Sequence, residues 1–343
     1  MSDLLTAALG YAERGWHVFP LNPDRPGNAD EDYAKRPAFP NRCTADRCDQ
    51  VDPRCRATGR HVGWEERATV DPDRIRRAWS TRPYNIGIAC GPSGLVVVDP
   101  DVPKHPGDTP PAEWAGSGTG MDVFAVLAAR HGSPIGWIAG YGRPDTPPRE
   151  GIDVTYTVDT PSGGSHLYYQ HPASGPQLRN TTSDRGRGLG WKIDTRAHGG
   201  YVVAGGSTVT GRPYKVALDC DPLPLPEWIA TLLTPAPLPA QGPTVVNLAA
   251  GRAGRYLATA IDGAVTHLRT AADGYRNNAL FNSAMVLGQL VAGGSLTSDD
   301  VYAVLTPVAR SLPGKTPLTE REIARTIASG LRVGATRPRS VAA

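Results

Sequence analysis

A proline-rich segment at residues 233–244 (LTPAPLPAQGPT) most constrains the fold, because neither a helix nor a central strand can run through it. Before it, short apolar runs alternate with glycine and proline turns, a pattern typical of a mixed α/β domain. After it, apolar residues recur at helical spacing in four segments, at 252–270, 275–291, 298–311 and 319–331. The predicted organisation is an α/β domain at 1–232, a linker at 233–244, an all-α domain at 245–335 and a tail at 336–343.

Charge is distributed unevenly along the chain. Residues 245–343 contain 11 basic and 6 acidic side chains, whereas residues 1–244 contain 25 basic and 27 acidic ones. A basic helical domain suggests contact with a polyanion, although an arginine-rich solvated surface explains the same numbers. No stretch approaches the roughly 20 apolar residues of a membrane-spanning helix, and the N-terminus lacks the layout of a signal peptide. We therefore expect a cytoplasmic protein with no membrane partner.

Two aspartates follow a strongly apolar run. Leu95–Val98 predicts a buried strand, and Asp99 and Asp101 come directly after it. Residues two apart on a strand point to the same side, and Pro100 fits between them only at a strand end. Two such carboxylates repel each other unless a cation lies between them, and Mg²⁺ or Mn²⁺ prefers oxygen ligands. The pair predicts a divalent-metal site, the alternative being a loop start with two solvated aspartates.

Two further segments contain candidate site residues. A hairpin turn is predicted at Ser162, Gly163, Gly164 and Ser165. Its glycines allow backbone N–H groups to approach phosphate oxygens, and His166, which begins the next strand, can donate to the same oxygens. Asp194 is a third carboxylate at a strand end, with Arg196 on its side of the strand. The alternatives are an ordinary turn with an exposed histidine, and a structural ion pair of Asp194 with an arginine.

Three of the five cysteines fall in one polar segment at 41–62, which lacks an apolar period. Disulfides are not expected in a cytoplasmic chain, so clustered cysteines indicate metal. Cys43, Cys48, Cys55 and His61 would give a closed tetrahedral Zn²⁺ site of a structural kind, able to order a loop without a core of its own. Asp46, Asp49, Asp52 and His105 are substitute ligands, and free surface cysteines are the alternative.

The elements named so far occur together in a specific order. The segments concerned are ALGYAERGWHVFPL, AKRP, ATVDPDRIRRAW, NIGIACGPSGLVVVDPD, TPSGGSHLYYQ and KIDTRAHGGYVVAGGS, which span residues 8–207. In this combination they resemble the bifunctional DNA primase/polymerase (Prim-Pol) family of phage and plasmid replication proteins, within the archaeo-eukaryotic primase superfamily. The resemblance implies an α/β catalytic domain with an antiparallel sheet similar to an RNA-recognition motif.

The resemblance also implies roles for single residues. Asp99 and Asp101 match the family's acidic metal-binding pair, Asp194 its third acidic ligand, and His166 its nucleotide-contacting histidine. Arg196 lies where the family places basic residues near the triphosphate. Three departures stand out: the second acid is aspartate where many relatives have glutamate, a proline separates the pair, and Gly164 replaces a serine common in the superfamily. None of these removes a ligand.

The C-terminal segments GYRNNALFNSAMVLGQLVAGG and TEREIARTIASGLRVG resemble the helical module, of the primase C-terminal type, that often follows a Prim-Pol domain. By this resemblance the module helps to bind template or the initiating nucleotide. Arg276, Asn277 and Asn278, at a helix start, are the candidates for phosphate contact. The alternative is a packing appendage with a basic surface. Relatives often continue into a helicase, which makes a helicase or another replisome component an expected partner.

These observations predict a template-directed primase and DNA polymerase that acts on single-stranded DNA and nucleoside triphosphates. It would use Mg²⁺ or Mn²⁺ for nucleotidyl transfer and Zn²⁺ for structure. Two other functions use the same residues. One is a metal-dependent nuclease or phosphohydrolase, and the other is a non-catalytic DNA-binding protein of replication initiation.

Overall fold

The computed structural model describes residues 3–25, 27, 30, 32–38, 48, 50, 52–133, 135–136, 150–183, 188–234, 244–247, 253–271, 275–313 and 317–342. The chain forms two compact units, residues 1–235 and 236–343. Most of the proline-rich segment, residues 235–243, lies outside the described residues. The two units are considered separately below.

The centre of the first unit is a largely antiparallel sheet, here called the main sheet, with strand order β10-β4-β5-β3-β6. Its strands are β3 (Leu95–Pro100), β4 (Thr157–Asp159), β5 (Ser165–Gln170), β6 (Ile193–Arg196) and β10 (Lys215–Leu218), and β11 (Leu223–Pro224) pairs in parallel with β5. β4 and β5 form the predicted hairpin. The apolar run Leu95–Val98 lies in β3, between β5 and β6, and is buried as predicted.

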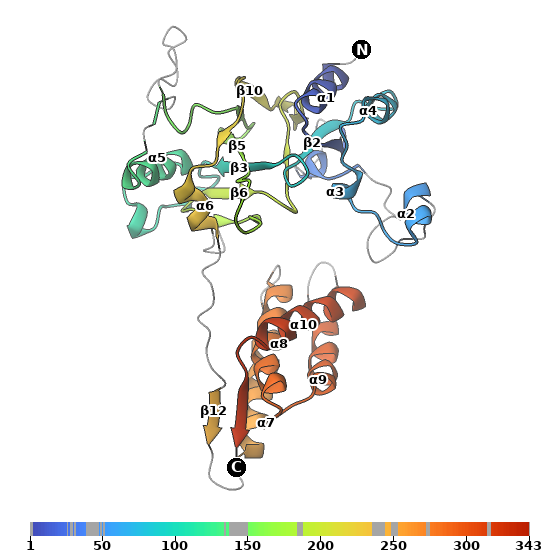
Figure 1. Cartoon of the computed structure of the whole chain (residues 1–343), viewed down its shortest axis with the longest axis vertical. Coiled ribbons are helices and arrows are strands. Elements are labelled where there is room, and N and C mark those ends of the chain that lie inside the picture. Colours follow the sequence, from blue (N-terminus) through green and yellow to red (C-terminus); the bar gives the residue numbers. More distant parts are fainter. Residues whose placement is uncertain are drawn as a thin grey trace. The chain divides into compact units, whose positions relative to one another are not determined.

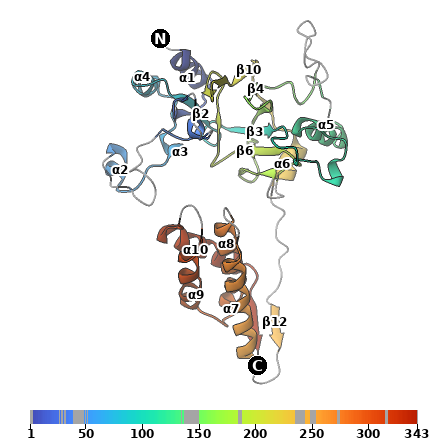
Figure 2. The ribbon, with the colours of Figure 1, turned by 180° about the vertical axis from the view of Figure 1, so that it is seen from behind.

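Each face of β3 packs into a different core, because successive side chains of a strand point to opposite faces. Val96 and Val98 pack with helices α5 (Gly120–Arg130) and α6 (Glu227–Leu233). Val97 packs instead with the core around α1 (Asp3–Glu13) and α4 (Pro72–Trp79). Figures 1 and 2 show α5 and α6 on one side of β3, and α1 and α4 on the other. Burial on both faces explains why β3 has no polar residue before Asp99.

A second antiparallel sheet, of strand order β1-β2-β7, belongs to the core around α1 and α4. Its strands are β1 (Val18–Leu21), β2 (Asn85–Ala89) and β7 (Tyr201–Val203), and a small hairpin of β8 (Thr208–Val209) and β9 (Arg212–Pro213) follows. Helix α4 begins at a local capping signal: the Asp71 carboxylate accepts hydrogen bonds from the N–H groups of Asp73 and Arg74, and Pro72 occupies the first turn.

Residues 21–62 lack an apolar period in the sequence, yet they contain short helices. They are the 3₁₀ turn η1 (Tyr33–Lys35) and α2 (Pro53–Thr58), followed by α3 (Trp64–Arg67). Helix α2 was missed because it is too short and too polar to show an apolar period. Its signals are local: Asp52 caps its first turn, and Gly59 ends it with φ of 66°. A further 3₁₀ turn, η2 (Ala112–Trp114), lies before α5.

The second unit contains the four predicted helices. They are α7 (Ala253–Arg269), α8 (Arg276–Ala292), α9 (Ser298–Arg310) and α10 (Glu320–Gly334), and they share one apolar core. The domain is not all-α, however. Residues 339–342, predicted as tail, form β13 (Arg339–Ala342), which pairs in parallel with β12 (Thr244–Asn247). Hydropathy within this unit did not reveal two four-residue strands, whose pairing depends on residues about a hundred positions apart.

Among the helices of the described part of the chain, we find none that combines the length and the apolar character needed to cross a membrane.

Candidate active site

The three predicted acids come together at the ends of neighbouring strands. Asp99 on β3 pairs directly with Asp194 on β6, and Asp101 follows the end of β3. Cβ atoms of directly paired residues lie roughly 5 Å apart, so these carboxylates share one face of the sheet. That face is the one from which Val97 projects, so it looks toward the second sheet. Pro100 stands at the last position of β3, where a missing N–H is tolerated.

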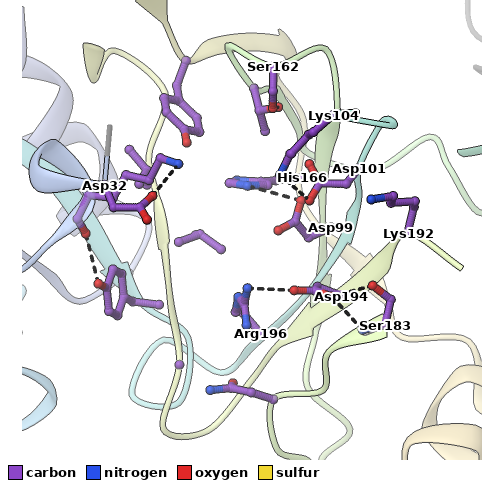
Figure 3. Close-up of a pocket in the computed structure, with 18 of the residues that line it drawn as sticks. Asp32, Asp99, Asp101, Lys104, Ser162, His166, Ser183, Lys192, Asp194 and Arg196 are labelled. Carbon is purple, nitrogen blue, oxygen red and sulfur yellow. Dashed lines mark hydrogen bonds and ion pairs between the residues drawn. The ribbon is translucent and has the colours of Figure 1, made fainter. Parts of the chain in front are cut away.

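The acids face a cavity of about 730 Å³ between the main sheet and β7. Figure 3 shows Asp99, Asp101 and Asp194 around it, with His166, Lys104 and Arg196 beside them. The polar residues that line it are Asp32, Lys35, Asp99, Asp101, Lys104, His105, Asp108, Thr160, Ser162, His166, Asn180, Ser183, Lys192, Asp194 and Arg196. Its aromatic lining consists of Trp64, Tyr201 and Tyr214. The cavity is large enough for a nucleotide and strongly polar, as a phosphate site would be.

Each acid has a different environment. Burial and, to a smaller extent, the nearby carboxylates of Asp101 and Asp194 together raise the pKa of Asp99 to about 7, against the opposing effect of the Arg196 guanidinium. The Asp101 carboxylate forms an ion pair with the Lys104 ammonium, with Oδ2 and Nζ 3.1 Å apart. Asp194 accepts hydrogen bonds from the Ser183 backbone N–H at 2.8 Å and from Arg196 at 3.0 Å. The raised pKa shows that the ionised form of Asp99 is disfavoured, mainly because the carboxyl is buried and then because two other carboxylates lie nearby, and a bound divalent cation would offset both effects.

His166, the second residue of β5, is buried beside Asp99. Its Nε2 lies 3.7 Å from Oδ1 of Asp99, too far for a hydrogen bond, and its Nδ1 has no hydrogen-bond partner among the described residues. Burial, with a smaller contribution from the charge of Arg196, lowers the pKa of this imidazole to about 3. The histidine is therefore neutral at neutral pH, with one N–H to donate and one ring nitrogen to accept.

Lys192 reaches into the cavity from a strained turn before β6. Its backbone has φ of 58°, a region that residues other than glycine rarely occupy and that concentrates at functional sites. Its carbonyl accepts a hydrogen bond from the N–H of Asp101 at 2.7 Å, which fixes the position of that acid. Its ammonium contacts Asp108 at 2.7 Å. The turn therefore places one acid and one cation together.

The glycine turn divides between two cavities. Ser162 lines the acidic cavity, whereas Gly163, Gly164 and Ser165 line a neighbouring one of about 230 Å³. Ser165 donates a hydrogen bond to Asp159 at 3.1 Å. A Cβ on Gly164 would lie 2.7 Å from the carbonyl oxygen of Pro100, so the absence of a side chain lets the turn pack against the chain between the two acids. Gly164 is therefore needed for backbone packing at this point. The phosphate contact expected from the sequence stays a prediction.

Several lining residues were not identified from the sequence. Lys104 lies three positions after Asp101, and this spacing was its only signal. Asp108 and Ser183 come from loops of no recognisable pattern. Tyr214 reaches the cavity from a part of the chain with no motif. His105, considered as a substitute zinc ligand, lines the acidic cavity instead.

The cysteine segment forms a second cluster. The ligand atoms of Cys48, Cys55 and His61 all lie within 4.8 Å of one another, close enough to share one metal ion. Cys43, the fourth predicted ligand, lies outside the described residues, as do Asp46 and Asp49.

Sγ of Cys55 accepts hydrogen bonds from the N–H of Val62 and from Arg67. Asp52 is used elsewhere, because it caps α2 and pairs with Arg67 at 2.7 Å. Donors aimed at a cysteine sulfur favour its thiolate form, the form that binds zinc.

At the start of α8, the three predicted phosphate ligands have different environments. Arg276 is buried, with 8% of its surface exposed, whereas Asn277 and Asn278 are exposed. Asn277 accepts a hydrogen bond from Thr326 at 3.2 Å. Of the three, the two asparagines are the more accessible to a strand in solution.

Comparison with known proteins identifies residues 8–228 as matching the family of the bifunctional DNA primase/polymerase, N-terminal. This match spans nearly all of the first unit and confirms the family expected from the motifs. A search of curated proteins found no match.

Proposed function

The chain belongs to the bifunctional DNA primase/polymerase family, and on that premise we propose that it synthesises primers on single-stranded DNA and extends them. Membership supports a primase or polymerase role in replication and a nucleotidyltransferase type of activity. The observation that supports the finer proposal is the convergence of Asp99, Asp101 and Asp194 in a polar cavity of nucleotide size.

We assign the three carboxylates to Mg²⁺ or Mn²⁺. Oxygen ligands at strand ends, and an acid whose pKa is raised to about 7 mainly by burial and then by neighbouring carboxylates, fit a hard divalent cation. When bound, such ions lower the pKa of the attacking 3′-hydroxyl and neutralise charge on the phosphates. Ser183 and Arg196 hold Asp194 in one orientation, and the Lys192 carbonyl fixes the backbone of Asp101. The ligands are thus positioned before substrate arrives.

The cations of the cavity are assigned to the triphosphate. Lys104, Lys192 and Arg196 line it from three different segments, and each already pairs with an acid. Binding of metal to the acids would free these groups to contact phosphate oxygens, since the metal then supplies the positive charge that the acids need. His166 is neutral, so its ring can donate one hydrogen bond to a phosphate without adding charge.

The Cys/His cluster is assigned to structural zinc. Three ligands converge beside α2, and Cys43 is the proposed fourth. Closure by four protein ligands would leave no open position for chemistry. The helical unit and a helicase partner are assigned to template binding and to the replisome on the strength of the family resemblance.

The test is incorporation of labelled nucleotides on single-stranded DNA with Mg²⁺ or Mn²⁺, using deoxynucleotides and ribonucleotides in separate reactions. Asp194→Asn should lower incorporation by a factor of about 100 or more, because a metal ligand is lost. Asp73→Asn, which alters an exposed ion pair with Arg76, is the matched control. Near wild-type synthesis by a folded Asp194→Asn protein would contradict the assignment. Degradation of a labelled strand without added nucleotide would identify a nuclease instead.

A further inference from the structure

A second cleft, of about 400 Å³, lies where α2 and α4 meet β1, and it is lined by arginines. Its polar lining includes Arg54 on α2, Arg67 on α3 and Arg74 on α4, and its floor includes Val18, Ile75 and Trp79. We call it the arginine cleft. Its residues take no part in the acidic cavity described above.

Arg67 holds the cleft together. Its guanidinium donates to the carbonyl of Val62 at 2.7 Å, to Asp52 at 2.7 Å and to Sγ of Cys55 at 3.2 Å. Only 7% of its surface is exposed. These bonds occupy Arg67 internally and tie the cleft to the Cys/His cluster, so its role is to position the wall of the cleft.

The other two arginines of the cleft have fewer hydrogen-bond acceptors and opposite charges around them. Arg74 donates from one terminal nitrogen to the Arg67 carbonyl at 2.9 Å, and its buried Nε has no hydrogen-bond partner among the described residues. Partial burial lowers the pKa of Arg54, and the charges of Arg74, Arg67 and Arg77 lower it further. Like charges placed this close repel one another, an arrangement that an incoming anion relieves.

The nearby carboxylates are already engaged. Asp52 accepts the ion pair from Arg67 and caps α2, and Asp71 caps α4 through the N–H groups of Asp73 and Arg74. The lining of the cleft has three arginines, at 54, 67 and 74, and one acid, Asp52, which leaves two positive charges. The excess is local, because residues 1–244 as a whole have two more acidic than basic side chains.

We infer that the arginine cleft binds the phosphate backbone of a nucleic-acid strand, the single-stranded template, on its way to or from the acidic cavity. The guanidinium group suits phosphate because its N–H donors match two phosphate oxygens at once. This inference rests on the proposed function, since it takes the acidic cavity to be the place of synthesis.

The position of the cleft fits a strand that continues from that cavity. Helix α3 links the two sites: Trp64 at its start lines the acidic cavity, and Arg67 at its end lines the cleft. β1 contributes to the cleft and β7 to the cavity, with β2 between them in the sheet. A strand of several nucleotides is long enough to contact both sites.

The test compares two double variants of the full chain that remove the same charge from the same two helices. Arg54→Gln with Arg74→Gln changes the cleft, and Arg56→Gln with Arg76→Gln changes arginines that do not line it. Binding to a fluorescent oligothymidylate is measured by anisotropy, without nucleotide or metal, across a series of salt concentrations. For the cleft variant we expect affinity to fall about tenfold or more, and the slope of log K against log salt to become shallower by about 1.4 for two lost phosphate contacts. The control variant should retain both values.

Each other outcome overturns the inference. Equal losses in both double variants would mean that only overall charge matters, and unchanged binding in the cleft variant would mean that DNA does not use the cleft. Competition by tripolyphosphate that depends on Arg54 and Arg74, with DNA affinity unaltered, would assign the cleft to a small anion. If the cleft variant does not fold, as judged by its thermal melt, the single change Arg54→Gln, at an exposed residue of α2 that lines the cleft, takes its place with the same expectation for one contact.

A nucleotide-incorporation assay separates failure of this inference from failure of the proposed function. A wild-type protein that binds DNA through the cleft but never incorporates nucleotide would leave the cleft in place and refute the polymerase. At saturating DNA the cleft variant should still extend a primer, because the three acids of the acidic cavity and the residues that hold them are unchanged.

Discussion

Replacing Asp99 by asparagine should stabilise the metal-free protein at neutral and higher pH while abolishing nucleotide incorporation. The pKa of this carboxyl is raised from 3.8 to about 7, mainly by burial and then by Asp101 and Asp194. In the folded state the acid therefore keeps its proton over a range of pH in which the unfolded chain has lost it. The contribution of Asp99 to folding stability therefore falls as the pH rises from about 4 to about 7, and it levels off above that.

The size of the effect follows from the two pKa values. A difference of roughly three pKa units, at ~1.4 kcal/mol each, gives up to ~4 kcal/mol lost above pH 7. Asparagine has nearly the same shape and does not ionise, so it avoids this loss. The stability difference between variant and wild type should be nearly absent at about pH 4 and should reach a few kcal/mol at about pH 8. Because 85% of the Asp99 side-chain surface is covered, solvent screening should not remove most of the effect.

Urea unfolding followed by tryptophan fluorescence measures this difference in the first unit, which contains Asp99. All seven tryptophans precede residue 235, so the signal reports the first unit and not the helical one. Added Mg²⁺ should stabilise the wild type through binding to the folded state and leave the variant nearly unchanged. If Asp99→Asn lowers the stability of the metal-free protein at about pH 8, the Asp99 carboxylate of the wild type makes net favourable contacts there. The argument from burial and neighbouring negative charge would then be wrong.

Three further changes test other parts of the molecule. Purified protein should contain about one zinc per chain, and Cys55→Ser should lose it and increase thiol reactivity, as elemental analysis and thiol titration would show. Gly164→Ala should lower incorporation about tenfold or more by pushing on the backbone next to Asp101, whereas Gly10→Ala, where an added Cβ meets nothing within 4 Å, should have little effect in the same assay. Removal of residues 245–343 should damage primer synthesis much more than primer extension, because two free nucleotides need extra binding surface; equal losses in the two assays would remove the helices from initiation.

The acids could be predicted from the sequence because their signals are local. A fully apolar strand that ends in Asp-Pro-Asp, and a second strand that ends in aspartate, each place a carboxylate at a sheet edge by the period of the strand alone. What no local pattern specifies is the pairing of Asp99 with Asp194, 95 positions along the chain. The family resemblance supplied that connection, since it ordered the motifs before any contact was known.

The partners of these acids had no comparable signal, for a physical reason. Lys104, Asp108 and Ser183 lie on loops, where side-chain direction depends on the path of the backbone and has no period. Lys192 depends on a single residue with positive φ, a conformation that the amino acid itself does not favour. The same holds for the arginine cleft, whose cations come from three helices with four to eight residues each. The proposed metal ligands lie on strands or directly after one, where sequence patterns can locate them, whereas Lys104, Lys192 and the arginines of the cleft are brought together only in the folded chain.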